Sequence, residues 1–265
     1  MKKYILAYLL LLYGVDAFAK NGLEEIIVEK YYVADQKDEE LSAGKLRAGS
    51  VTYRIFAKML PGYRFQAAYG VPGHPLFLKT STYFFNTNTE TATANEIQSK
   101  DLNKGALMLD SWLSVAASAD KYMAVLKSSD TTKAILNTTG FLENKSHVAG
   151  IPISVRDGML PASPVPVVNY FGIDSTLLDV FKSENSISNG QQFFTENGSW
   201  ACFGGSAGTD SSNCVLIAQI TTNGKFSFEL NIQIGTPTGN VENYVARNPK
   251  QEEIKLDSLV FHSDK

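Results

Sequence analysis

Hydrophobic and polar residues alternate along several stretches of this chain, and the alternation predicts β-strands. The longest such stretch covers residues 51–59, VTYRIFAKM. Because successive residues of a strand point to opposite faces, the polar face here carries Thr52, Arg54 and Lys58. The opposite face is apolar and consists of Val51, Tyr53, Ile55, Ala57 and Met59.

A second pair of alternating runs surrounds Asn223-Gly224. Asn-Gly between two such runs is the typical sequence of a two-residue type I′ turn, because both turn positions need positive φ. We therefore predict a β-hairpin in which Ile217 faces Leu230. The apolar positions that follow the turn are Phe226, Phe228, Leu230, Ile232 and Ile234.

The remaining segments predict further short strands, two loops and one helix. A helix is expected at 174–184, capped by Asp174 or Ser175. Residues 34–49 are charged and glycine-containing and predict a solvated loop, and residues 87–105 predict a long polar surface loop. Further strands are expected at 23–33, 63–71 (returning from 51–59), 76–86 and 106–118, with a proline-spaced extended run at 151–168.

This order of elements predicts a mostly β protein, an antiparallel β-sandwich or jelly-roll-like fold with one or two short helices. No change of composition marks a linker, so we expect a single domain over residues 20–265. A division into two sandwiches near residue 150 is the alternative.

The N-terminal segment has the three parts of a secretory signal peptide. Two lysines precede an apolar run from Tyr4 to Val15, and Ala17-Phe18-Ala19 forms an A-x-A cleavage site. The apolar run is too short to span a bilayer as a helix. We expect residues 1–19 to be removed and the mature chain to begin at Lys20, exported to an extracellular or periplasmic location, with no membrane span.

Composition and charge narrow the range of partners. The formal net charge is −3 and charged residues make up only 19% of the chain, without Lys/Arg clusters. This balance provides no electrostatic footprint for nucleic acid or anionic lipid. It suits an exported β-protein whose strand faces are polar but weakly charged. The oligomeric state does not follow from it.

Four motifs, in a fixed order, resemble a family of uncharacterised secreted bacterial proteins, often from Bacteroidota. They are T-Y-R at 52–54, D-S-W at 110–112, G-S-W at 198–200 and V-L-I-A-Q-x-T-T at 215–222. The resemblance covers nearly the whole mature chain and implies a bacterial exported protein. It implies no activity and no catalytic residues.

The stretch from Cys202 to Cys214 contains G-x-S-x-G around Ser206, the pattern of a hydrolase nucleophile elbow. The elbow requires a helix directly after the serine, and AGTDSSNC has no helical period. We therefore interpret Ser206 as part of a glycine-rich hairpin tip and assign no catalytic residue. An exported chain with two cysteines predicts a Cys202–Cys214 disulfide across this tip.

Three histidines offer few ligands for a metal. His74 lies between Pro-Gly and Pro and is expected in a turn, and His147 lies in a polar loop. No zinc-binding spacing is present, so no metal and no cofactor is predicted. The loops GTDSSN and ASADKY offer oxygen ligands for a structural calcium ion, but neither matches the twelve-residue calcium loop.

Candidate binding residues lie on the polar face after the predicted turn. Glu229, Asn231 and Gln233 form a row that would line a sugar-binding groove, or else a solvated strand face. Trp112 and Trp200 are expected in the core. Adjacent acids such as Glu24-Glu25 are expected to point to opposite faces as solubilising charge.

Two classes of function remain. The first is an exported, non-catalytic binding or surface-structural protein that recognises glycan, a matrix or cell-surface component, or a sister copy. The alternative is a secreted polysaccharide hydrolase with Glu229 and a second, unidentified acid.

Overall fold

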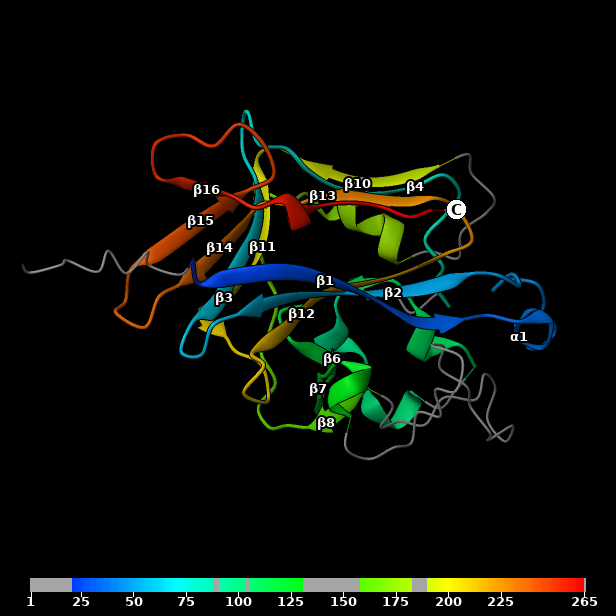
Figure 1. The fold of residues 1–265 in the computed structure, drawn as a ribbon. Helices are drawn as coiled ribbons and strands as arrows, with labels where there is room; N and C mark the ends of the chain where they lie inside the picture. The colour runs from blue at the N-terminus through cyan, green and yellow to red at the C-terminus, as the bar shows by residue number, and fades with distance from the viewer. Residues whose placement is uncertain (1–20, 88–90, 103–104, 131–157, 183–189, 265) are drawn as a thin grey trace, which may run out of the picture.

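The computed structural model describes residues 21–264 apart from 88–90, 103–104, 131–157 and 183–189. The predicted signal peptide and His147 lie outside the described residues. The described chain is mostly β, with strands arranged in several packed sheets, as predicted (Figure 1). No helix within the described ranges is long and apolar enough to cross a membrane.

A four-stranded sheet lies in the middle of the molecule (Figure 1). Its order is β1–β2–β12–β5, and all three neighbouring pairs are antiparallel. Its strands are β1 (Leu23–Val33), β2 (Val51–Met59), β12 (Cys214–Thr222) and β5 (Trp112–Leu113).

Three further sheets surround this central sheet. A second four-stranded sheet contains β10 (Gln191–Thr195), β4 (Leu76–Thr80), β13 (Phe226–Glu229) and β17 (Val260–His262), in that order. A three-stranded sheet contains β6 (Ala117–Ala119), β7 (Tyr122–Ala124) and β8 (Met159–Pro161). Strands from before and after residue 150 pair in several sheets, for example β2 with β12 and β4 with β13.

The largest sheet has six strands and forms one end of the molecule (Figure 1). Its neighbouring strands are antiparallel except for the parallel pair β15–β16. In order, the strands are β16 (Glu253–Lys255), β15 (Val241–Val245), β14 (Ile232–Gly235), β3 (Arg64–Gly70), β11 (Gly198–Ser206) and β9 (Asn169–Phe171).

Two hydrophobic clusters lie on opposite faces of the central sheet. In β2, the predicted apolar face from Val51 to Met59 lies in the first cluster, and Phe56 lies in the second. Trp200 belongs to the first cluster and Trp112 to the second, so both tryptophans are in the core as predicted. All nine residues of β12 are buried, because both of its faces are covered.

Arg54 is a buried cation within the central sheet. It is 1% exposed, its Nε donates to Gln219 Oε1 at 2.9 Å, and its Nη1 donates to Gly158 O at 3.0 Å. The guanidinium also stacks on the ring of Tyr31, 3.6 Å from the centroid. Glu29, opposite Arg54 in β1, has a raised pKa because burial disfavours its charged form. A buried charge is tolerated when its donors are paired in this way.

Gln219 links Arg54 to the segment around the D-S-W motif, at the end of a short 3₁₀ turn before β5. Its Nε2 donates to Met108 O at 2.9 Å and to Asp110 O at 2.8 Å. Farther along the same strands, Thr221 Oγ1 donates to Thr52 Oγ1 at 2.7 Å. Three of the four sequence motifs therefore meet in one buried polar network.

The predicted hairpin around Asn223-Gly224 is wrong. β12 pairs with β2 and β5, whereas β13 pairs with β4 and β17 in a different sheet. Neither Asn223 nor Gly224 has positive φ. The glycine is needed for a close approach instead: a Cβ at Gly224 would lie 2.6–2.7 Å from side-chain oxygens of residues 80–82. The predicted return of β3 beside β2 is also wrong. β3 pairs with β11 and β14 in the six-stranded sheet.

Two segments predicted as solvated loops contain packed structure. Within 34–49, α1 (Gln36–Leu41) begins with a capping box between Asp35 and Asp38, and Asp38 is buried against the hydroxyl of Tyr32. Within 87–105, the apolar residues Ala94, Ile97 and Leu102 pack into the second cluster. A few anchoring residues are enough to hold a largely polar segment against the core.

The predicted helix at 174–184 is a 3₁₀ helix, η5 (Ser175–Phe181). Asp174 caps it by accepting from the Thr176 amide, as expected. The other 3₁₀ helices of the described chain are η1 (Ala94–Glu96), η2 (Ser99–Asp101), η3 (Leu107–Leu109), η4 (Lys127–Ser129) and η6 (Asp257–Leu259).

We expect Arg54→Ala to lower the free energy of unfolding by about 3–5 kcal/mol, because it leaves buried acceptors without a donor and opens a cavity. Lys58→Ala in the same strand is the matched control. Its ammonium is about one-third exposed and contacts two glutamates, so its removal should cost about 1 kcal/mol or less. Urea unfolding of both variants measures the difference, and equal losses would contradict the role given to Arg54.

Candidate functional site

A shallow groove of about 380 Å³ lies on the outer face of the six-stranded sheet. The inner face of this sheet supplies Trp200, Ile232, Ile234 and Tyr244 to the first hydrophobic cluster. Because side chains alternate, their sequence neighbours point to the other face. The groove is lined by Ala67, Tyr69, Val71, Ser199, Gln233, Asn243 and Glu253.

Strand register explains why these residues meet. Gln233 in β14 is opposite Asn243 in β15, and Asn243 is opposite Glu253 in β16. On the other side, Gln233 is opposite Ala67 in β3. The small side chain of Ala67 leaves the end of this row low, beside the longer side chain of Gln233.

A second row runs beside the first. Tyr69 in β3 is opposite Ser199 in β11, and Ser199 is opposite Phe171 in β9. The two rows together place at least one outward-facing side chain from each of the six strands on the same face. Residues between 67 and 253 of the chain thus meet on one surface.

Two amides form the centre of the polar row. Gln233 Nε2 donates to Asn243 Oδ1 at 3.0 Å. This bond orients both side chains. It leaves the carbonyl oxygen of Gln233 and the amide nitrogen of Asn243 without a partner among the described residues. The centre of the groove therefore offers both an acceptor and a donor.

Tyr69 and Glu253 add a phenol and a carboxylate. Burial, and to a lesser extent the nearby Glu253 carboxylate, raises the pKa of Tyr69 to about 12. The hydroxyl therefore stays protonated at neutral pH and remains a donor. Glu253 Oε2 accepts from the Lys250 amide at 2.7 Å, which holds the carboxylate in place.

His74 supports Glu253 from beneath. Its Nε2 lies 3.1 Å from Glu253 Oε2, without the alignment of a hydrogen bond. The His74 side chain is 2% exposed. His74 lies in the predicted turn, bridged to Val71, and its side chain is buried.

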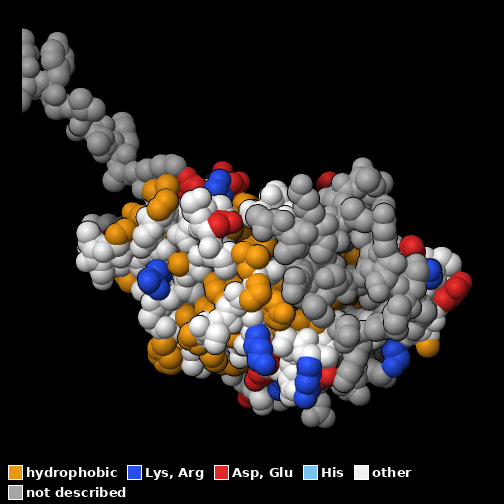
Figure 2. Space-filling view, turned by 90° about the horizontal axis from the view of Figure 1, so that it is seen from below, with side chains coloured by type: hydrophobic (Ala, Val, Ile, Leu, Met, Phe, Trp, Pro, Cys, Tyr) orange, Lys and Arg blue, Asp and Glu red, His pale blue; other side chains and the backbone are white. Residues whose placement is uncertain are grey.

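Exposed aromatic rings flank the far end of the second row. Phe171 is 46% exposed and Phe203 is 74% exposed, and their rings contact edge to face at 5.6 Å. Exposed apolar side chains that contact one another often mark a binding surface. Exposed apolar groups also occur elsewhere. On the face shown in Figure 2, hydrophobic side chains gather in several groups with scattered charged ones between them.

The structure places the three predicted binding residues, Glu229, Asn231 and Gln233, in three different surroundings. Gln233 lines the groove, but Glu229 Oε2 accepts from Arg247 Nε at 2.8 Å, outside the lining. Asn231 is buried, and its amide donates to the carbonyl oxygens of Tyr69, His74 and Pro75. It therefore holds the turn beside the groove. The chain leaves strand pairing between Glu229 and Ile232, and β14 joins a different sheet from β13.

Sequence patterns alone missed the remaining groove residues. Tyr69 and Ser199 come from strands β3 and β11, whose pairing joins distant parts of the chain, whereas Asn243 and Glu253 come from β15 and β16, which follow β14 in sequence. The β-branched and aromatic residues Val241, Tyr244 and Val245, which follow β14 after a turn, were an available signal for β15.

Ser206 is not in a hairpin tip. It is the last residue of β11, opposite Phe65 and 2% exposed. Gly204 and Gly205, both with positive φ, form the irregular pairing that precedes it. The chain then continues through a loop into β12 and not into the helix that a nucleophile elbow requires.

The predicted Cys202–Cys214 disulfide is not formed, and both cysteines are free. Cys202 packs against the first hydrophobic cluster and Cys214 lies in the second. Since these clusters lie on opposite faces of the central sheet, the two thiols are separated. β11 and β12 belong to different sheets, so they are not the two arms of one hairpin.

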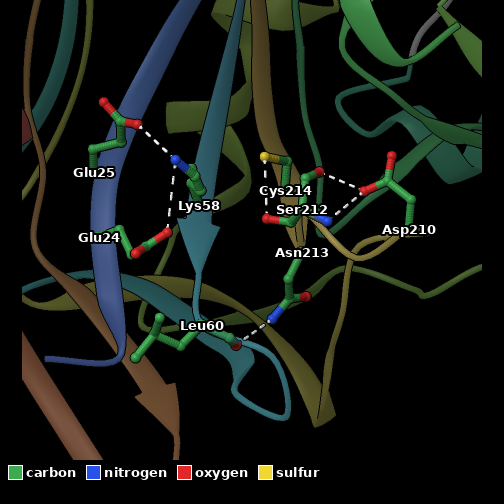
Figure 3. A network of polar contacts seen from close by, with 8 residues as sticks. All are labelled: Glu24, Glu25, Lys58, Leu60, Asp210, Ser212, Asn213 and Cys214. Atoms are coloured by element: carbon green, nitrogen blue, oxygen red, sulfur yellow. Dashed lines mark hydrogen bonds and ion pairs between the residues drawn. The ribbon is translucent and has the colours of Figure 1, made fainter. Parts of the chain in front are cut away.

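The end of the central sheet near Cys214 is held by local polar contacts (Figure 3). Asn213 Nδ2 donates to Leu60 O at 2.8 Å, which anchors the loop before β12. A bulge after Leu23 turns both Glu24 and Glu25 toward Lys58, at 3.6 and 3.2 Å. The expectation that these two acids point to opposite faces is therefore wrong.

The two loops considered for calcium use their acids as local caps. Asp210 Oδ1 accepts from the Ser212 amide at 2.8 Å (Figure 3), and Asp120 Oδ1 accepts from the Ser99 amide at 2.8 Å. Within the described ranges no cluster of three or more His, Cys, Asp or Glu is placed to hold a metal ion.

A second hollow, of about 240 Å³, is lined by residues around Ser42, Phe85 and Ala106. It borders on segments outside the described residues, so the groove on the six-stranded sheet is the better-defined site. Comparisons of the chain with protein-family models, with curated proteins and with solved structures find no match.

We expect the native protein to expose one slowly reacting thiol, Cys202, and to release Cys214 only on unfolding. Burial raises the pKa of both thiols above the ordinary value of 9.0. Because the thiolate is the reactive form, Cys202 should react slowly at pH 8 and faster as the pH rises past 9. Ellman titration of native and denatured protein, repeated with Cys202→Ser, checks this. No titratable thiol even after unfolding without reductant would instead support the disulfide.

Proposed function

We propose that this protein is an exported, non-catalytic carbohydrate-binding protein, whose ligand lies in the groove on the outer face of the six-stranded sheet. Export rests on the N-terminal signal sequence, and the extracellular or periplasmic site follows from it. The groove supports the binding role.

The observation that carries the proposal is the row Gln233–Asn243–Glu253, beside Tyr69 and Ser199. A sugar presents several hydroxyl groups, each of which both donates and accepts hydrogen bonds. Amides, hydroxyls and a carboxylate fixed on adjacent strands match that requirement without a large rearrangement on binding. The exposed rings of Phe171 and Phe203 offer apolar faces for the C–H faces of sugar rings.

Binding is favoured over hydrolysis by the placement of the acids. A glycosidase needs two carboxyl groups across the scissile bond, about 5–10 Å apart. Glu253 is the one acid in the lining of this groove. Glu229, the candidate for a hydrolase, is paired with Arg247 instead.

We expect Gln233→Ala to weaken binding by about tenfold for any polysaccharide that retards the wild-type protein in a gel. The substitution removes the central acceptor and also the hydrogen bond that orients Asn243. The matched control is Gln192→Ala, an exposed strand amide in β10 of another sheet, which should bind like the wild type. Affinity electrophoresis across a panel of plant, algal and microbial polysaccharides, with reducing-end release measured in parallel, provides the readout.

Two outcomes would count against this proposal. If no polysaccharide retards the wild-type protein, or if both variants bind equally well, the groove is not the binding site. Release of reducing ends by the wild type, abolished by Glu229→Gln, would instead support the hydrolase.

A further inference from the structure

We infer that the ligand of this groove is an uncharged polysaccharide chain that lies across the strands, with the phenylalanine pair Phe171–Phe203 contacting one end and Glu253 selecting against anionic chains at the other. The inference rests on the proposed function and specifies the class of ligand.

The length of the site points to a chain rather than a single sugar. The outward-facing side chains run from Glu253 in β16 to Phe171 in β9, the two edge strands of the sheet. Five inter-strand intervals of about 4.8 Å give a span of roughly 24 Å. A monosaccharide covers only a part of this distance, so full contact requires several linked sugars.

The charge of the site points to a neutral chain. The lining contains one carboxylate, Glu253, and neither lysine nor arginine. Recognition of carboxylated or sulfated sugars in proteins relies on Arg and Lys, which pair with the anion. A uronic acid or sulfate placed beside Glu253 would meet a like charge. Lys250 carries a cation near the turn at Gly73, outside the lining.

The Glu253 carboxylate is held so that one of its oxygens is available to a ligand. Its Oε2 is occupied by the Lys250 amide and by the contact with His74. Its Oε1 has no partner among the described residues. An ionised carboxylate only accepts hydrogen bonds, so the group that meets Oε1 must donate, as a sugar hydroxyl does.

The phenylalanine pair supplies the other end of the contact. Cys202 packs toward the core, so its neighbour Phe203 points outward, where it meets Phe171. Both rings have exposed faces and carry no polar atoms, which suits stacking on a sugar ring. Their distance from the polar row means that only the longer chains can reach both.

The test measures binding of defined oligosaccharides by calorimetry. The neutral probes are the hexamers and dimers of cellulose, mannan, xylan, laminarin and starch, and the anionic probes are hexagalacturonate and a heparin hexasaccharide. We expect one neutral hexamer to bind at least tenfold more tightly than its dimer and than either anionic probe.

Two variants, each with a matched control variant, separate the parts of the inference. Phe203→Ala should weaken hexamer binding about tenfold without changing dimer binding, and Phe194→Ala, an exposed phenylalanine in β10, should change neither. Glu253→Gln should raise affinity for hexagalacturonate by at least fivefold, and Lys250→Gln should not. Phe203 is so exposed that its variant tests the site even if Glu253→Gln disturbs folding.

The outcomes distinguish this inference from the proposed function. If the wild type prefers an anionic hexamer and Gln233→Ala weakens the binding of that hexamer, the groove binds carbohydrate but the inference of a neutral ligand is wrong. If a neutral dimer binds as well as the hexamer, or Phe203→Ala has no effect, the extended site is wrong. If no probe and no polysaccharide binds, both proposals fail.

Discussion

The burial of both faces of the central sheet is the constraint on which the rest of the structure depends. A sheet covered on both sides must pair or neutralise every polar group it contains, since an unpaired buried group costs much of its hydration energy. Arg54 is the most demanding of these groups. Gln219, Gly158 and the ring of Tyr31 satisfy it, and each comes from a different part of the chain.

This constraint also leaves one sheet face free for function. The first hydrophobic cluster takes up one face of the central sheet and the inner face of the six-stranded sheet. The outer face of the six-stranded sheet then carries the polar side chains that alternate with core residues. A rigid sheet holds them at fixed separations, so the groove needs little ordering when a ligand binds. The buried Asn231 and His74 add support, because each holds a part of the chain next to the lining.

Local patterns predicted the strands well and their partners poorly. The alternation in β2 placed Val51 to Met59 in one core cluster, and the tryptophans were buried as expected. Alternation says which residues share a face, but it does not say whether the other face meets water. Arg54 and Thr52 were predicted on the polar face of this strand, and they are buried because a second layer covers that face.

The errors around the hairpin and the cysteines have the same origin. Gly224 does not have the positive φ that a type I′ turn requires. A glycine is needed there because side chains of residues 80–82 pass close by. Because β11 and β12, like β12 and β13, belong to separate sheets, Cys202 and Cys214 do not face one another. The groove could be predicted only in part, through Gln233, because most of its other lining residues depend on non-local pairing. Contacts between distant strands leave no signal in a single sequence.

The most direct test of the account is to map ligand contacts on the protein by amide chemical shifts during titration with the neutral hexasaccharide that binds best. The account predicts that the shifted amides concentrate in β3, β11, β14 and β15, and extend to the edge strands β9 and β16. Shifts concentrated around Ser42, Phe85 and Ala106, or the absence of shifts on the six-stranded sheet at saturating ligand, would contradict it.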